Sequence, residues 1–202
     1  MTGLRERKKQ ATRTALSEAA LRLALERGPD NVRVDDIAEA AGVSPRTYNN
    51  YFPSREDAIV FAVTTDREQR VADAIRAADR SARLADAVLE AVVAQYTEPV
   101  EDHREALLLI TTSPALRTAY AGTAAALEHP LAEALADHLG DAEGPTAQVL
   151  AAGVAAAVRI ALGQWARPAG GSSGFVVVSG SLADLLRAAL APLVPALDAA
   201  QR

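Results

Sequence analysis

Alanine is the feature of this sequence that most limits what it can fold into. The chain has 202 residues, half of them apolar; 46 are alanine, and Phe, Trp and Tyr together make up only 4%. Alanine has the highest helix propensity, and side chains this small fill a core only where helices pack closely. We therefore expect an all-α protein of one or two compact domains, and we exclude a β-sandwich and a disordered chain.

The sequence carries no sign of export or of a membrane span. Cysteine is absent, which excludes disulfides, thiolate metal ligands and cysteine nucleophiles. Half of residues 1–10 are charged, and this segment lacks the apolar stretch of a secretion signal. The most apolar stretch of the chain, residues 149–163, is interrupted by Arg159. We expect a cytoplasmic protein that does not bind membranes.

Glycine and proline divide the chain into helices. Gly28 and Pro29 end a first helix, Gly42 separates the second from the third, and Pro53 stops the third before a fourth begins at Ser54. Pro130 should bend or split a later helix. Residues 175–178 are β-branched or aromatic, but too isolated to build a sheet, and they could equally extend the final helix. The helices expected are a first one from residue 2 or 5 to residue 27, and then 34–41, 44–52, 54–78, 83–97, 102–111, 114–139, 145–166 and 181–197.

Charge is unevenly distributed along the chain. The net charge is −5, but residues 1–60 carry ten basic and nine acidic side chains, and residues 61–202 carry eleven and seventeen. The first 14 residues hold five basic side chains and one acidic one. A surface that attracts a polyanion should therefore be N-terminal, with a solvated basic helix start as the alternative.

Residues 32–52 have the pattern of a helix-turn-helix. Small and branched residues let two short helices cross at a steep angle, and Gly42 can adopt the positive φ of the turn. The second helix is rich in hydrogen-bond donors that suit base edges and phosphates, and Arg55 near a helix start suits a phosphate. The residues predicted to bind duplex DNA are Lys8, Lys9, Arg33, Arg46, Thr47, Asn49, Asn50, Tyr51 and Arg55.

Residues 37–56 read IAEAAGVSPRTYNNYFPSRE, which resembles the N-terminal signature of the TetR family of bacterial transcriptional repressors. Three positions depart from it: Arg33 replaces a helix-capping Thr, Asn49 replaces a common phosphate-binding Tyr, and Arg55 replaces Lys. The resemblance implies a three-helix DNA-binding domain over residues 1–53. It also implies that residues 54–202 form a helical domain that binds a small inducer and forms a homodimer on a palindromic operator.

The second domain contains candidate ligand and dimer residues. Residues 111–117 and 131–135 are similar to the mycofactocin-type subgroup, which suggests an acyl-CoA or another small apolar or amphipathic inducer. The predicted lining of an apolar cavity, with core packing as the alternative, is Tyr96, Leu108, Tyr120, Leu127 and Trp165. A face of small residues suited to close helix packing, preferably across a dimer axis, is Ala151, Ala152, Ala155, Ala156 and Gly163.

We find no enzyme site in the sequence, and expect no catalytic residue, cofactor or metal. Residues 170–174 match G-x-S-x-G without the strand that a nucleophile elbow requires. His103, His129 and His138 lack a shared metal-binding spacing. The acidic residues of 98–105 read as solvated charges at a helix start. The alternative is a helical enzyme or scaffold with a purely structural helix-turn-helix.

Overall fold

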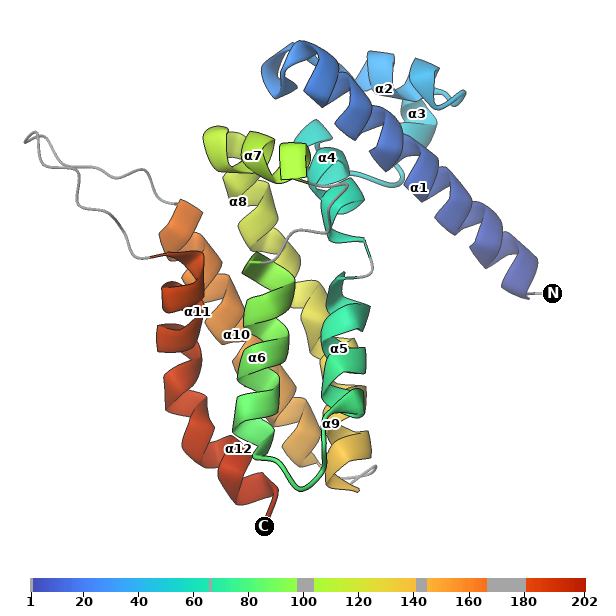
Figure 1. The fold of residues 1–202 in the computed structure, drawn as a ribbon. Coiled ribbons are helices and arrows are strands. Elements are labelled where there is room, and N and C mark those ends of the chain that lie inside the picture. Colours follow the sequence, from blue (N-terminus) through green and yellow to red (C-terminus); the bar gives the residue numbers. More distant parts are fainter. Residues whose placement is uncertain (1, 66, 98–103, 141–144, 167–180) are drawn as a thin grey trace, which may run out of the picture. The chain divides into compact units, whose positions relative to one another are not determined.

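The computed structural model describes residues 2–65, 67–97, 104–140, 145–166 and 181–202, and every regular element in these ranges is a helix (Figure 1). The all-α expectation is confirmed. The chain divides into two compact units, Met1–Thr65 with Glu101–Tyr120, and Asp66–Val100 with Ala121–Arg202. The domain boundary expected after residue 53 follows the end of the helix-turn-helix pattern. In the structure, the next helix, residues 55–64, packs with the N-terminal residues and belongs to the first unit.

The first unit is built around a long N-terminal helix. Helix α1 packs on α2, α4 and α7, and its buried side chains include Leu16 and Leu23. Ile37 of α2, Tyr48 of α3 and Ile59 of α4 are fully buried in the same unit. Its elements are α1 (Thr2–Arg27), η1 (Pro29–Asn31), α2 (Val34–Ala40), α3 (Pro45–Tyr48), α4 (Arg55–Thr64), α7 (Arg104–Thr112) and α8 (Pro114–Gly122).

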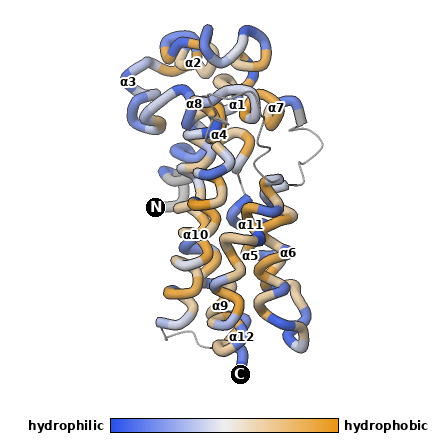
Figure 2. Tube along the Cα trace, turned by 90° about the vertical axis from the view of Figure 1, so that its left-hand side faces the viewer, coloured by the Kyte–Doolittle hydropathy of each residue, from blue (hydrophilic) through white to orange (hydrophobic). Residues whose placement is uncertain are grey.

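The second unit is a helical bundle. Helix α10 packs on α9 and α11, while α5 packs on α6 and α9, and α6 and α10 are predominantly hydrophobic along their length (Figure 2). Alanines 151, 155, 157 and 161 are buried, which is the close packing that the composition predicts. The elements are α5 (Arg67–Ala77), α6 (Leu84–Thr97), η3 (Thr123–Leu127), α9 (Glu128–Leu139), α10 (Pro145–Ala166), α11 (Leu182–Leu190), η4 (Ala191–Leu193) and α12 (Val194–Ala200).

Three of the expected helices are interrupted at positions that the sequence analysis did not identify. The expected helix 54–78 breaks at Thr65, where the hydroxyls of Thr64 and Thr65 donate to the carbonyls of Val60 and Phe61, 3.1 and 2.6 Å away. Such local bonds compete with helix continuation. The expected helix 114–139 changes to 3₁₀ geometry at residues 123–127, before Pro130. Pro130 lies in the first turn of α9, where its missing N–H has no helical partner.

The third interruption is at the C-terminus, where residues 191–193 form a 3₁₀ turn between α11 and α12. Pro192 and Pro195 lie in the first turns of the two elements that follow the break. The side chain of Gln201 then accepts from the Leu84 amide at 2.7 Å and donates to the Ala82 carbonyl at 2.6 Å. The end of the chain is thereby held against the start of α6.

Helix α10 is the one helix in the described ranges that is long and apolar enough to cross a membrane by length and composition alone. Half of that window is buried inside the protein, as expected of a core helix. Several sequence features lie outside the described residues: the β-branched run 175–178, the G-x-S-x-G match at 170–174, His103, and the acidic residues 98–102.

Candidate DNA-binding site

The turn between α2 and α3 is closed by a Schellman motif. Gly42 has a φ of 69°, and its amide donates to the Glu39 carbonyl at 3.0 Å. The Val43 amide donates to the Ala38 carbonyl at 2.9 Å. These two bonds satisfy carbonyls that a helix end otherwise leaves open, and glycine adopts the positive φ without strain. The turn is therefore formed as the sequence predicts.

Helix α3 begins at the predicted cap. The Ser44 hydroxyl accepts from the Thr47 amide at 3.1 Å and lies 2.9 Å from the Thr47 hydroxyl, and Pro45 occupies the first helical position. Regular α-helix ends at Tyr48, but backbone bonds continue to Phe52, whose amide donates to the Tyr48 carbonyl at 3.2 Å. We call residues 45–52 the recognition segment.

Two aromatic side chains anchor the recognition segment. Tyr48 is fully buried, and its hydroxyl donates to the Ser54 carbonyl at 2.7 Å. Burial raises the pKa of Tyr48 well above its usual range, and the carboxylates of Asp57 and Glu56 add to the shift. Phe52 is 3% exposed and lies against Tyr48 and Phe61. Tyr48 therefore has a structural role, and its neighbours present the polar groups.

Three predicted base-reading residues are exposed on this segment. Arg46, Asn49 and Asn50 are exposed, and the described part of the chain offers their side chains no hydrogen-bond partner. The Thr47 hydroxyl is engaged in the Ser44 cap, and Tyr51 is half-buried. The free donors of the first three fit base edges and phosphates, whereas Thr47 supports the helix start.

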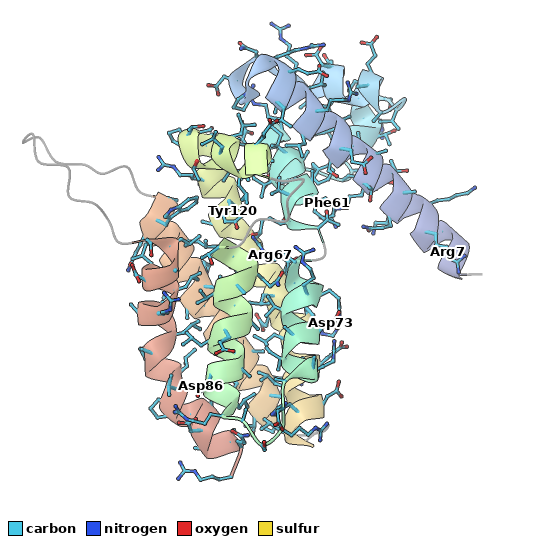
Figure 3. The ribbon with its side chains drawn as sticks, in the orientation of Figure 1. Arg7, Phe61, Arg67, Asp73, Asp86 and Tyr120 are labelled. Carbon is cyan, nitrogen blue, oxygen red and sulfur yellow. The ribbon has the colours of Figure 1, made fainter. Side chains whose placement is uncertain are left out.

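The basic residues of α1 lie beyond the packed part of that helix. Arg7, Lys8 and Lys9 are exposed, and burial along α1 begins only at Leu16. Figure 3 shows Arg7 near the N-terminal end of α1. A projecting helix turn with adjacent cations suits contact with the phosphate backbone. Arg33, at the start of α2, is exposed as well.

Arg13 is a residue that the sequence reasoning missed. Its guanidinium carbon lies 4.1 Å from the ring centroid of Phe61 and 5.5 Å from that of Phe52. This cation–π contact joins α1 to α4 and to the end of the recognition segment. Its position within the basic N-terminal run suggested only a solvated charge, because the contact depends on residues about 40 to 50 positions away.

Arg55 is half-buried and its guanidinium faces the protein. Nε donates to Glu56 Oε1 at 2.8 Å, and Nη1 donates to the carbonyls of Asp30 at 3.0 Å and Val32 at 2.9 Å. Partial burial raises the pKa of Glu56, but the bond from Arg55 and the bonds from its own backbone amide and Ser54 outweigh this, so the pKa is lowered. The predicted phosphate contact of Arg55 remains a prediction.

The predicted ligand residues are divided between the two units. Leu108, 64% exposed, and Tyr120, 3% exposed, belong to the first unit. Tyr96 and Leu127 are buried in the second unit, where Trp165 is half-buried. Two grooves of about 480 and 620 Å³ in the second unit, one lined by α9 and α10 and the other by α5 and α6, contain none of the five. A shared cavity therefore stays a prediction.

Tyr96 packs on a buried cation that the sequence reasoning missed. Arg67, at the start of α5, is 2% exposed, and its guanidinium carbon lies 4.0 Å from the Tyr96 ring centroid (Figure 3). Its Nη2 donates to the Thr123 hydroxyl at 2.6 Å and to Glu68 Oε1 at 3.2 Å.

In the described residues, no cluster of His, Cys, Asp and Glu could hold a metal ion.

The fold and the site define a DNA-binding protein of the helix-turn-helix class. Residues 16–60 match the model of bacterial regulatory proteins of the tetR family, and residues 71–198 match the MftR C-terminal domain. The chain belongs to the TetR family and carries a C-terminal domain of the MftR type. The matched families are families of transcriptional regulators and not of enzymes, which supports a DNA-binding regulator over the alternative of a helical enzyme or scaffold.

A curated relative supports the same assignment. The HTH-type transcriptional regulator TcmR of Streptomyces glaucescens is 46% identical over 55 residues, which are 27% of this chain and 24% of TcmR. The match spans about a quarter of the length of that relative, so it supports the family and does not carry over the relative's whole activity.

Proposed function

We propose that this regulator is a repressor that binds a palindromic operator as a homodimer and leaves it when a small apolar or amphipathic molecule binds the C-terminal helical unit. The observation that carries the DNA-binding part is the recognition segment, where Arg46, Asn49 and Asn50 present free donors on a helix fixed by the Gly42 turn and the Ser44 cap. Access to chromosomal DNA places the protein in the cytoplasm.

Selection of bound fragments from random duplex DNA by the purified chain tests this proposal. We expect a palindrome with half-sites about 34 to 36 Å apart, because one short helix reads few base pairs and two-fold symmetry repeats the half-site. Failure to enrich any palindrome at low salt would contradict the proposal.

Variants then separate base readout from phosphate contact. Arg46→Ala or Asn50→Ala should cost about 1 to 3 kcal/mol on the selected site and much less on random DNA. Lys8→Ala with Lys9→Ala should weaken binding to all sequences alike and flatten its salt dependence. If Arg46→Ala loses the same binding free energy on both kinds of DNA, the Arg46 side chain contacts the DNA phosphate backbone and not the bases.

A face of α10 supports dimerisation. Val149 is 67% exposed and Ile160 is 52% exposed, and their separation is about three helical turns, so they share one face. The structure divides the small residues predicted for this face. Ala151 and Ala155 are buried in the subunit's own core, whereas Ala152, Ala156 and Gly163 are half-buried on the side of Val149 and Ile160. Exposed apolar side chains beside small ones favour close contact with a second copy.

Sedimentation of charge variants tests the dimer. Ile160→Glu should shift the chain to a monomer, because it places a carboxylate on the apolar face. Ala115→Glu, at an exposed position of α8 and therefore outside the α10 face, is the matched control and should remain dimeric. If both variants remain dimeric, this face of α10 is not the dimer interface.

We place the inducer in the MftR-type domain, with an acyl-CoA as the first class to test. Trp165 is the single tryptophan of the chain and is half-buried, so its emission can report on binding in that unit. A ligand that changes this emission should release operator DNA over the same concentration range, since binding and release share one coupling free energy. Tyr96→Phe, in the same unit as Trp165, should weaken the response and leave operator affinity unchanged. Release without a change of emission would place the ligand away from Trp165.

A further inference from the structure

Arg55 connects α4 to the segment that leads into α2. It is the first residue of α4, and the two carbonyls that its Nη1 holds belong to Asp30 and Val32, more than 20 positions earlier in the chain. Nη2 also lies 3.7 Å from the Asp30 carboxylate. One side chain therefore ties the first helix of the helix-turn-helix pair to the helix that follows the pair.

Helix α2 needs such support because its own cap is incomplete. Its N-cap residue is Arg33, whose side chain contains no hydrogen-bond acceptor and makes no capping bond. The one reciprocal bond runs the other way, from the Arg33 amide to Asp36 Oδ2 at 3.1 Å. The chain that enters α2 is held by the buried side chain of Val32, by the bond from Asn31 Nδ2 to the Arg27 carbonyl at 2.7 Å, and by the two carbonyl bonds to Arg55.

The same contacts make Arg55 a poor phosphate ligand. A guanidinium has five N–H donors, and the bonds from Nε and Nη1 occupy the three donors of these two nitrogens. Two carboxylates, of Glu56 and Asp30, lie within 4 Å of the group. An anionic phosphate would have to approach against their combined charge.

We propose that Arg55 is a positioning residue that holds α2 in register with α4 for DNA binding, and that it does not contact a phosphate. The proposal rests on the DNA-binding function above and assigns the role of one residue within it. It explains why an arginine stands at the position where the family signature has lysine: an ammonium is a point donor, and it cannot make the planar set of bonds to Glu56 and both carbonyls.

The first test compares Arg55→Lys with Arg55→Gln in the full chain. Two quantities are measured: operator affinity as a function of salt, and hydrogen exchange of the Ile37 and Ala38 amides. A positioning role predicts that both variants weaken binding by a similar factor, roughly tenfold. It predicts an unchanged salt slope and faster exchange in α2. Lys9→Gln is the matched control, and should reduce the slope by about 1 without changing exchange in α2.

A second variant should change operator affinity in opposite directions, depending on whether Arg55 is a positioning residue or a phosphate contact. Glu56→Gln keeps Arg55 but replaces its charged acceptor by a neutral one, which weakens the hydrogen bond. A positioning role predicts about threefold weaker operator binding and faster exchange in α2. A phosphate contact predicts tighter binding, because the substitution removes a nearby negative charge.

The proposal is overturned if Arg55→Lys binds like the parent chain while Arg55→Gln flattens the salt slope, or if Glu56→Gln tightens binding. Exchange of amides in α10 shows whether a variant has lost its fold elsewhere. If the parent chain binds no duplex DNA, the proposed function fails, but the exchange rates in α2 still decide whether Arg55 holds that helix.

Discussion

The two units differ in how their geometry is encoded. In the first unit the turn, the cap and the recognition segment arise from residues within a few positions of one another, such as Gly42 with Glu39 and Ser44 with Thr47. In the second unit the packing brings together helices that lie apart in the sequence, with buried alanines in α10 and buried leucines in α9 and α11. A local motif carries its function in its sequence, whereas a packed bundle reveals its binding site only once its helices are placed.

Core truncation gives the largest expected effect and tests whether the units are independent. Ile37 in the first unit and Leu135 in the second are both fully buried. Replacing either by alanine should cost about 2 to 5 kcal/mol of local stability. Hydrogen exchange should accelerate in α2 and α3 for Ile37→Ala, and in α9 and α10 for Leu135→Ala. Equal acceleration in both units for either variant would show that they unfold together.

Gly42 and Gly122 form a pair that isolates backbone conformation. A Cβ at either position meets nothing within 4 Å, but Gly42 has a φ of 69° and Gly122 has a φ of −68°. Gly42→Ala should destabilise the first unit by about 1 to 2 kcal/mol, because the left-handed region is costly for an L-residue. Gly122→Ala should be neutral or stabilising, by up to about 1 kcal/mol. Exchange of the Val43 amide reports the first variant, and thermal unfolding compares the two. A stable Gly42→Ala protein would mean that the turn can rearrange.

The sequence predicts the local turn and cap of the first unit better than it predicts the breaks between helices. Gly42, Ser44 and Pro45 lie where the pattern places them, because turn and cap signals act over a few residues. The breaks at Thr65 and at residues 123–127 were missed, since helix propensity there is overridden by side-chain bonds and tertiary packing.

Charged residues show most clearly which contacts cannot be predicted from the sequence. The pattern treats Arg13 and Arg55 as solvated or DNA-facing cations, yet one stacks on Phe61 and the other bonds to two carbonyls. Arg67 is nearly fully buried beside Tyr96. In each case the role of the arginine depends on a contact with residues far away in the sequence, and the hydrophobic periodicity does not predict such a contact.

The caps of α2 and α3 should respond to substitution in opposite directions. Ser44→Ala removes the acceptor of the Thr47 amide and should cost about 1 kcal/mol. Arg33→Thr supplies α2 with the side-chain acceptor that it lacks and should add roughly 0.5 to 1 kcal/mol. Hydrogen exchange of the first-turn amides in α2 and α3 measures both changes. No gain for Arg33→Thr would indicate that Asp36 and Arg55 already supply the full stabilisation.

The smallest expected effect is a dependence on pH in the first unit alone. The pKa of Glu56 is lowered in the folded chain, because the bonds from Arg55, its own backbone amide and Ser54 outweigh its partial burial. A group with a lowered pKa binds fewer protons when folded, so it contributes stability above its unfolded pKa and loses it as the pH falls through the folded one. The stability of α2 and α4 should therefore decline as the pH drops below about 4.3, the ordinary glutamate pKa. In Glu56→Gln this part of the decline should be absent. Hydrogen exchange followed from pH 6 towards pH 3 measures the difference, and identical profiles for the two proteins would show that the bond from Arg55 to Glu56 contributes nothing to folding.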